Sequence, residues 1–335
     1  MMKVSIFDVA RKSGLSVVTV SRVINNADTV REKNRNKVLQ AMKELDYHPN
    51  AAARSLARGK TGVIGIIIMT LNDSFLDAVV KEINDKLEAH HYLLALFISK
   101  EDETDLHSAI FQEDRVDGMF ILSPIHEERY VEELTRKNIP FVMIDNQQEN
   151  PSVPSVQVDN FRGGYEATKH LIDLGHMDIV HVSGPSLFLS SKERIRGYLS
   201  AMESAGLPTR IEQGNFDINS GYEIAERWLE SGTLPTAVFV ADDLIAFGVM
   251  DALKNKGYRI PQDLSVIGFD DQLFADQFRP ALTTVRQPVE LIGSHAIDLL
   301  LKRMENLDAP VSQEPWRLQP ELIIRQSTCP PASKK

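Results

Sequence analysis

The chain contains very little cysteine, since Cys329 is the only one among 335 residues. One thiol cannot form a disulfide framework within the chain. It also cannot supply the several cysteines that a structural zinc site uses. We therefore expect no disulfide-stabilised scaffold, no metal site and no cofactor.

Long apolar segments and common catalytic signatures are also missing. The apolar run GVIGIIIM at 62–69 is far too short to cross a bilayer, and the N-terminal MMKVSIFDVARKSG is charged where a secretory signal would be apolar. No GxSxG, GxGxxG or HExxH pattern occurs. These absences indicate a cytoplasmic protein that is not an enzyme.

The charge is divided unequally along the chain. Residues 1–60 contain 12 Lys and Arg against 5 Asp and Glu, a net charge of +7, whereas the remaining residues contain 25 against 42, a net charge of −17. A small basic module joined to an acidic body is typical of a protein whose N-terminal part binds a polyanion. Nucleic acid is the obvious partner.

Three short helical patterns occupy the first 48 residues. The first ends near Gly14, the second is capped by Ser16, and the third begins at about Arg31. Apolar residues at helical spacing would form their common core: Ile6, Val9, Ala10, Val20, Val23, Ile24, Val38, Ala41, Met42 and Leu45. Two helices joined by a tight turn and backed by a third predict a helix-turn-helix domain.

The second helix carries residues suited to duplex DNA. Hydroxyl groups can donate to phosphate oxygens, an arginine can pair with guanine O6 and N7, and valines can contact thymine methyl groups. The predicted major-groove residues are Ser16, Val17, Val18, Thr19, Ser21, Arg22 and Asn25.

A short alanine-rich segment, PNAAARSLAR at 49–58, follows this domain. Pro49 suits the start of a helix, but a helix of one or two turns is marginal in water. The segment therefore fits a helix that folds only when docked, with a plain interdomain linker as the alternative.

From residue 62 onward, β-rich runs alternate with amphipathic helical segments. The strand-like runs are GVIGIIIM, YLLALFI, GMFILS, PFVMID, IVHVSG, AVFVAD and SVIGFDD, all expected to be buried and parallel. Four of these runs end at or beside Asp145, Ser183, Asp242 and Asp270. Ligands bind beyond the carboxyl ends of parallel strands, so these polar residues predict a lined cleft.

Three stretches of the sequence resemble the LacI family of bacterial transcription regulators: VSIFDVARKSGLSVVTVSRVINN at 4–26, HPNAAARSLARGKTGVIG at 48–65 and LQPELIIRQST at 318–328. The resemblance covers nearly the whole chain. It implies an all-α helix-turn-helix domain at 1–48, a hinge helix at 49–60, and an effector-binding and dimerisation domain at 61–330 with the type I fold of periplasmic binding proteins. Its N-subdomain would comprise about 61–160 and 288–321, and its C-subdomain about 161–287 and 322–330.

The same resemblance implies roles for particular residues. Leu56 would be a wedge that kinks the operator in the minor groove, which Asn50, Ala53, Arg54 and Ala57 would line. Val17, Val18 and Arg22 would occupy the base-reading positions, and the two valines predict few hydrogen-bonded base contacts. The effector would contact Asn72, Phe75, Asp145, Asp159, Arg194, Phe216, Asp242, Asp270 and Gln287.

These cleft residues favour a neutral sugar or short oligosaccharide as the effector. Carboxylates with one arginine suit pairs of hydroxyl groups, aromatic rings can stack on a sugar, and an anionic ligand would be repelled. We therefore expect a homodimeric repressor of carbohydrate-metabolism genes that binds a pseudo-palindromic operator.

Two alternatives remain open. One is a global regulator of the same family that is activated by a corepressor or a partner phosphoprotein. The other is a glycoside-processing enzyme that uses paired cleft carboxylates, although this would leave the basic N-terminal module unexplained.

Overall fold

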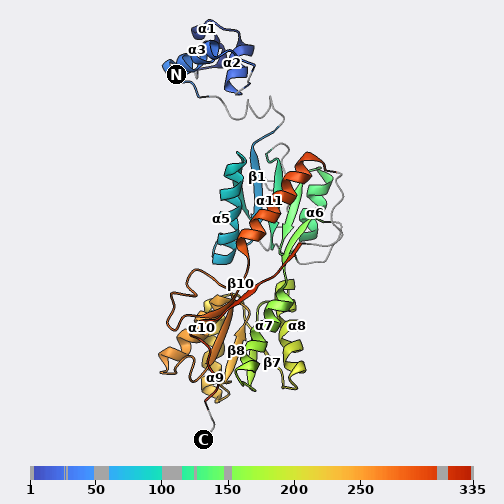
Figure 1. Ribbon diagram of the computed structural model, residues 1–335, viewed down its shortest axis with the longest axis vertical. Helices are drawn as coiled ribbons and strands as arrows, with labels where there is room; N and C mark the ends of the chain where they lie inside the picture. Colours follow the sequence, from blue (N-terminus) through green and yellow to red (C-terminus); the bar gives the residue numbers. More distant parts are fainter. Residues whose placement is uncertain are drawn as a thin grey trace. The chain divides into compact units, whose positions relative to one another are not determined.

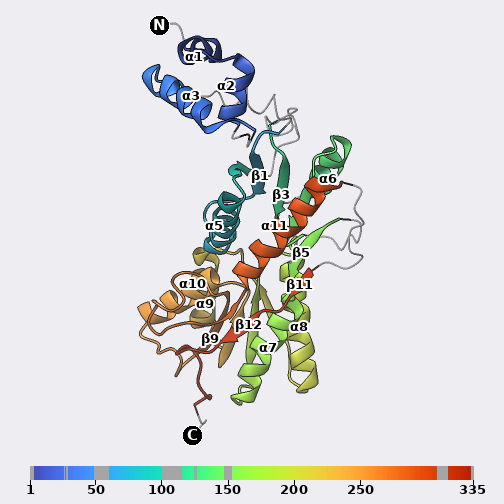
Figure 2. The same cartoon turned by 45° about the horizontal axis from the view of Figure 1, so that its top comes forward.

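The computed structural model describes residues 4–25, 27, 29–48, 60–99, 115–123, 127–146, 153–307 and 316–332 (Figures 1 and 2). They form two compact units: the first contains the described residues up to Gly62 together with 115 and 116, and the second contains the rest. The helices are α1 (Ile6–Ser13), α2 (Val17–Ile24), α3 (Glu32–Glu44), α5 (Ser74–Ala89), α6 (Glu127–Arg136), α7 (Asn160–Asp173), α8 (Leu189–Ser204), α9 (Ile218–Ser231), α10 (Asp243–Asn255) and α11 (Val289–Glu305). The strands are β1 (Val63–Ile68), β2 (Leu93–Ile98), β3 (Gly118–Leu122), β4 (Phe141–Ile144), β5 (Ser155–Val158), β6 (Ile179–Ser183), β7 (Arg210–Gln213), β8 (Ala237–Val240), β9 (Ser265–Asp270), β10 (Thr283–Arg286), β11 (Trp316–Leu318) and β12 (Glu321–Ile323). Among the described residues, no helix is long and apolar enough to span a membrane.

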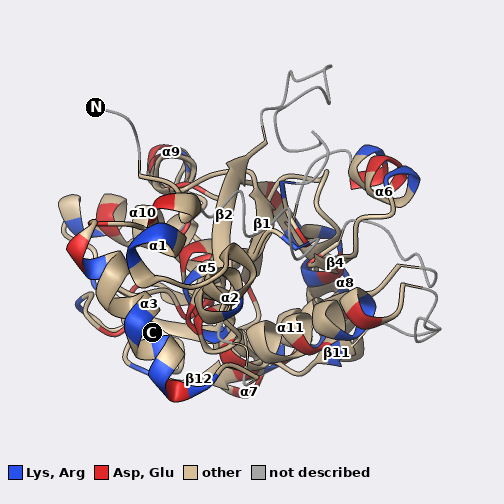
Figure 3. Ribbon diagram, turned by 90° about the horizontal axis from the view of Figure 1, so that it is seen from above, with Lys and Arg blue, Asp and Glu red and all other residues tan. Residues whose placement is uncertain are grey.

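The first unit contains the three predicted helices. A capping box between Ser5 and Asp8 starts α1, which ends at Gly14 in the left-handed conformation (φ 70°). The Ser16 side chain caps α2, as predicted from the sequence. Val9, Val20 and Val38 are fully buried in the core that the three helices share. Lys and Arg residues recur along α1 and α3 (Figure 3).

The second unit contains two six-stranded sheets. One has the order β11-β5-β4-β3-β1-β2, and the other has the order β12-β10-β9-β8-β6-β7. The chain therefore passes between the sheets after β5, after β10 and between β11 and β12. All pairings are parallel except that of β10 with β12, which is antiparallel. This architecture confirms the predicted α/β class with mostly parallel sheets.

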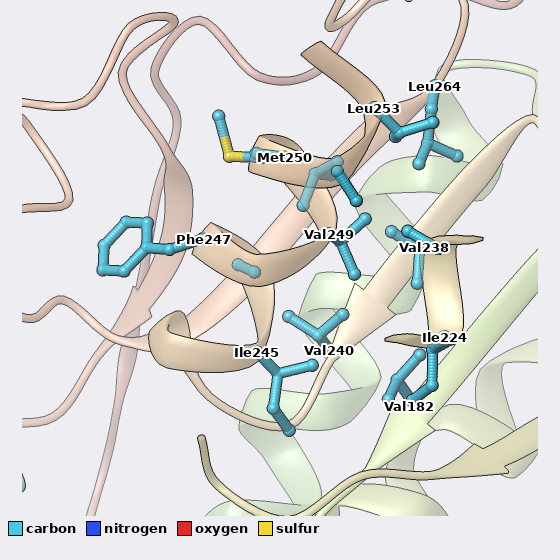
Figure 4. Close-up of a cluster of buried hydrophobic side chains, with 14 of the residues drawn as sticks. Val182, Ile224, Val238, Val240, Ile245, Phe247, Val249, Met250, Leu253 and Leu264 are labelled. Carbon is cyan, nitrogen blue, oxygen red and sulfur yellow. The ribbon is translucent and has the colours of Figure 1, made fainter. Parts of the chain in front are cut away.

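Helices cover both faces of the second sheet because its strands are apolar on both sides. Val238 and Val240 of β8 pack into one core with residues of α9 and α10, and Figure 4 draws part of this cluster. Phe239, which lies between them in sequence, belongs to the opposite core, formed with α7 and α8. In the first sheet, α5 and α11 pack against one core that includes residues of β1, β3 and β4.

Strand β2 differs from the sequence-based expectation. It was predicted to be buried, but it lies at the edge of its sheet, and Leu93, Leu96 and Ile98 are 69%, 40% and 47% exposed. An apolar run predicts a strand, but it does not tell which strand lies at the edge of the sheet.

Candidate functional site

The outer face of α2 presents the residue types that read DNA. Val18 is 61% exposed, and the Arg22 side chain is exposed with no ion pair to any described residue. These two side chains lie four residues apart and therefore on one face of the helix. The face can offer a methyl surface and a bidentate donor to base edges.

The remaining predicted major-groove residues are partly engaged within the domain. The Ser16 hydroxyl accepts from the Thr19 amide at 3.2 Å and lies 2.9 Å from the Thr19 hydroxyl. Val17 is half-buried against the three-helix core, and Asn25 donates to the Ser21 hydroxyl at 3.5 Å. Thus Val17 offers a ligand less surface than Val18 does.

The predicted hinge residues Asn50, Ala53, Arg54, Leu56 and Ala57 lie outside the described residues. Their minor-groove role stays a prediction from the sequence.

A second candidate site lies in the α/β body, around Arg194 of α8. This side chain is 4% exposed. Its Nε donates to Asn160 Oδ1 at 2.9 Å, its Nη1 donates to the Ala241 carbonyl, and its Nη2 lies 3.5 Å from Asp270 Oδ1. The guanidinium also lies 3.6 Å above the centre of the Phe269 ring. Arg194 therefore joins the ends of several elements that are distant in sequence.

Asp270 ends β9 and is the carboxylate nearest to Arg194. It accepts from Gln287 Nε2 at 2.6 Å, and its backbone is left-handed (φ 104°). Burial raises the pKa of Asp270 to about 6, although the positive charge of Arg194 opposes the shift. Asp270, Gln287 and Arg194 were predicted as one site, and the structure brings these three together.

Asp242 follows β8 and caps α10. Its Oδ1 accepts from the Ile245 amide at 2.8 Å, whereas Oδ2 is buried with no hydrogen-bond partner among the described residues. Burial and the nearby Asp270 charge raise the pKa of Asp242 well above its ordinary value.

Asp145 follows β4 on the other sheet. Its Oδ2 accepts from the Ser123 hydroxyl at 2.6 Å, and burial raises the pKa of its carboxyl group even though Arg194 acts in the opposite direction. A small pocket beside it is lined by Asp145, Asn146, Gln157, Val158, Asp159, Asn160, Leu189, Ser190, Glu193 and Arg317. This pocket contains two of the predicted effector residues, Asp145 and Asp159.

The other predicted effector residues have structural roles or little free surface, except Asn72. Asp159 caps α7 by accepting from the Arg162 amide at 2.9 Å. Phe75 is only 8% exposed within the core of the first sheet, so little of its ring is left for a ligand. Phe216 packs against the core of the second sheet, with its ring centre 5.7 Å from that of Phe188. Asn72 is exposed.

Sequence reasoning missed Asp73, Asn160 and Gln272. Asp73 caps α5 through bonds from the Phe75 and Leu76 amides, and burial raises the pKa of its carboxyl group. Its position after β1, directly before a helical pattern, was a usable signal for the same sheet edge. Gln272 Oε1 accepts from the Ser74 hydroxyl at 2.7 Å across 198 residues, and no local pattern predicts such a contact.

Comparison with known proteins relates both parts of the chain to known families. Residues 5–50 match the family model of bacterial regulatory proteins, lacI family, and residues 168–328 match that of a periplasmic binding protein-like domain. Catabolite control protein A of Priestia megaterium is 36% identical over 335 residues, which covers 98% of this chain and 100% of the relative.

Solved structures give the same result. A lac repressor dimer bound to operator and the anti-inducer ONPF has a TM-score of 0.87 and 28% identity, covering 98% of this chain and 100% of that one. A complex of the transcriptional regulator CelR with cellobiose has a TM-score of 0.73 and 28% identity, covering 97% and 100%. The relatives are regulators and not enzymes. This chain belongs to the LacI family of DNA-binding transcriptional regulators.

Proposed function

We propose that this protein is a cytoplasmic, homodimeric repressor of carbohydrate-metabolism genes that binds a pseudo-palindromic operator and responds to a sugar in the cleft around Arg194. The observation that carries this proposal is the exposed face of α2, on which Val18 and Arg22 lie together. In this proposal Arg22 reads one base pair in each half-site, and Val18 contacts a thymine methyl group.

The edge strand β2 supports a dimer. Leu93, Leu96 and Ile98 expose apolar surface on a strand whose outer edge pairs with no other described strand, and such edges are normally covered or charged. A similar structure, the lac repressor, is a dimer on its operator. A twofold dimer presents two copies of α2, as a pseudo-palindromic operator requires.

The donors and acceptors of the cleft support a sugar ligand. Asp145 and Asp270 can accept from hydroxyl groups, and Asn160 and Gln287 lie at hydrogen-bond distance from the cleft charges. CelR, a similar structure, is a complex with cellobiose. An anionic ligand would meet several carboxylates, so a neutral sugar or short oligosaccharide fits better than a nucleotide or a sugar phosphate.

Coupling between the cleft and the operator follows from linkage. If the ligand favours one arrangement of the two sheets and the operator favours the other, each must change the affinity for the other by the same factor. In this mechanism residues 50–58 form the hinge helix on operator DNA, with Leu56 as the wedge, and a bound inducer disfavours that helix.

Selection of binding sites from random duplexes, followed by titration of the selected operator, tests this function. Arg22→Ala should lose roughly 1–3 kcal/mol of discrimination at one base pair per half-site. Arg11→Ala, which removes an exposed charge from α1, is the matched control and should leave the base preference unchanged. Failure to select any sequence, or an equal loss by Arg22→Ala on random DNA, contradicts the proposal. Adding sugars to the operator titration then tests the coupling.

A further inference from the structure

Four aspartates lie in the neighbourhood of Arg194. Asp270 Oδ1 is 3.5 Å from Arg194 Nη2, and Asp242 directly follows Ala241, whose carbonyl accepts from Arg194. Asp73 precedes Ser74, which donates to Gln272, two residues after Asp270. Asp145 lines a pocket together with Asn160, to which Arg194 donates. The four aspartates come from the ends of four different segments of the two sheets. At the pocket beside Asp145, Asp159 and Glu193 add two negative charges and Arg317 adds one positive charge, which increases the excess. The cleft therefore contains more carboxylate than its own cations can neutralise.

Arg194 uses three of its five N–H donors within the fold. Nε contacts Asn160, Nη1 contacts the Ala241 carbonyl, and Nη2 contacts Asp270. Its two remaining N–H donors add no further charge, so one guanidinium faces four aspartates and a cationic ligand group could balance them.

Asp242 gives an independent indication that a donor belongs in the cleft. One oxygen caps α10, but Oδ2 has no partner among the described residues, although the side chain is only 2% exposed. Its neighbour Asp243 is equally buried, but both of its oxygens are used: Oδ1 accepts from the Thr284 hydroxyl at 2.6 Å and Oδ2 from the Gln272 amide at 2.7 Å. A buried acceptor without a donor is costly, so Asp242 Oδ2 is available for a ligand, whereas Asp243 is structural.

We propose that the cleft selects a sugar that carries a protonated amine, and that Asp242 and Asp73 bind the ammonium group while Asp145, Asn160 and Asp270 bind hydroxyl groups. This inference rests on the proposed sugar-responsive function and replaces the neutral sugar of that proposal with an amino sugar, which carries a positive charge. An ammonium group supplies three donors and one positive charge, which the unpartnered oxygen and the excess carboxylates require. Within the described residues, no group of three or more His, Cys, Asp or Glu could hold a metal ion.

The raised pKa values of these acids agree with this assignment. Burial raises the pKa of Asp73, Asp145, Asp242 and Asp270, and the Asp270 charge raises the pKa of Asp242 further. A positively charged ligand group would lower these pKa values, because it favours the ionised carboxylates.

Calorimetric titration of the full-length protein at pH 7 tests the inference with sugars of matched skeleton. The probes are glucosamine, galactosamine and mannosamine, their N-acetyl derivatives, and the parent hexoses. We expect at least one amino sugar to bind more tightly than both its N-acetyl derivative and its parent hexose. The N-acetyl group removes the charge but retains the ring, so it separates charge from shape.

Two variants assign the preference to the carboxylates. Asp242→Asn and Asp73→Asn remove one charge each while retaining a residue that caps helices equally well, so both proteins should fold. Each variant should weaken amino-sugar binding by roughly 30-fold, the loss typical of one buried charge partner, while binding of the parent hexose does not weaken. Asp251→Asn removes an exposed charge from α10 and should change nothing.

The possible outcomes separate this inference from the proposed function. If parent hexoses bind as tightly as amino sugars, or if Asp242→Asn retains the amine preference, the inference is wrong while the sugar-responsive function stands. If no probe of any class binds, both the amine preference and the sugar ligand are wrong, while operator binding is tested separately.

Discussion

Replacing Asp270 with asparagine should reduce the dependence of protein stability on pH. Burial raises the pKa of this carboxyl group from 3.8 to about 6 in the folded protein. Asn retains an oxygen that can accept from Gln287 Nε2, but it has no titratable proton. The variant therefore removes the titration of residue 270 while keeping its main hydrogen bond.

The magnitude follows from the difference between the folded and unfolded pKa values. Because the folded state binds the proton more tightly, Asp270 contributes full stability below about pH 4, and this contribution is lost as the pH rises through about 6. A difference of about two pKa units corresponds to about 3 kcal/mol in the free energy of unfolding. Roughly half of this change falls between pH 5 and pH 7.5. Burial, and after it the Asp270 charge, raises the pKa of Asp242 and of Asp243, so both add to the slope in the same direction.

Urea unfolding at pH 5 and pH 7.5 measures the effect. Trp228 is fully buried in the core of the second sheet, whereas Trp316 is 48% exposed, so a change in tryptophan fluorescence follows the unfolding of that core. The wild type should lose at least roughly 1.4 kcal/mol more than Asp270→Asn between the two pH values. The absolute stability of the variant at one pH is not diagnostic, because Arg194 loses a charged neighbour.

The exposed variant Asp251→Asn is the control and should retain the wild-type slope. Equal slopes for the wild type and Asp270→Asn would refute the assignment of a buried, proton-binding carboxyl group to this position.

Three further predictions concern other contacts. Ser16→Ala should weaken operator binding on every sequence, because losing the cap of α2 costs about 1 kcal/mol of helix stability. Ser16→Asn replaces the cap and should keep most of the affinity. An electrophoretic mobility assay measures both. Gly248→Ala should lower the free energy of unfolding, measured in urea, by roughly 1–3 kcal/mol, since the added Cβ would lie 2.0 Å from the Ile218 carbonyl oxygen. If the variant is as stable as the wild type, α9 and α10 can separate without cost. Ser74→Ala removes the hydrogen bond to Gln272, worth about 1 kcal/mol, which links the segments that follow β1 and β9 on the two sheets. The radius of gyration of the ligand-free protein, measured by small-angle X-ray scattering, should therefore increase. An unchanged radius would mean that other contacts hold the sheets together.

Local sequence determined much of this protein. Ser16 and Gly14 specify helix ends through their own backbone and side-chain chemistry, so α1 and α2 could be predicted within a residue or two. The long apolar runs predicted seven strands, since central parallel strands are buried on both faces. The short strands β5, β7, β10, β11 and β12 were not predicted as strands, because polar residues interrupt them, whereas the equally short β4 and β8 lie in continuous apolar runs.

Tertiary structure decided which side chains form the cleft. The sequence suggested Asp145, Asp242 and Asp270 because each follows a strand, and Arg194 by resemblance to a family. Only the folded chain brings Asp73 close to Asp242 and Asp270, and leaves one oxygen of Asp242 without a partner.

The physical reason is the range of the interactions. Helix caps, turns and apolar periodicity arise within a few residues, and the sequence encodes them where they occur. The burial of a charge and the edge position of a strand depend on contacts between segments separated by up to about 200 residues, such as that between Ser74 and Gln272. No local pattern specifies those contacts, so the family and the three N-terminal helices could be read from the sequence, whereas the electrostatics of the cleft required the fold.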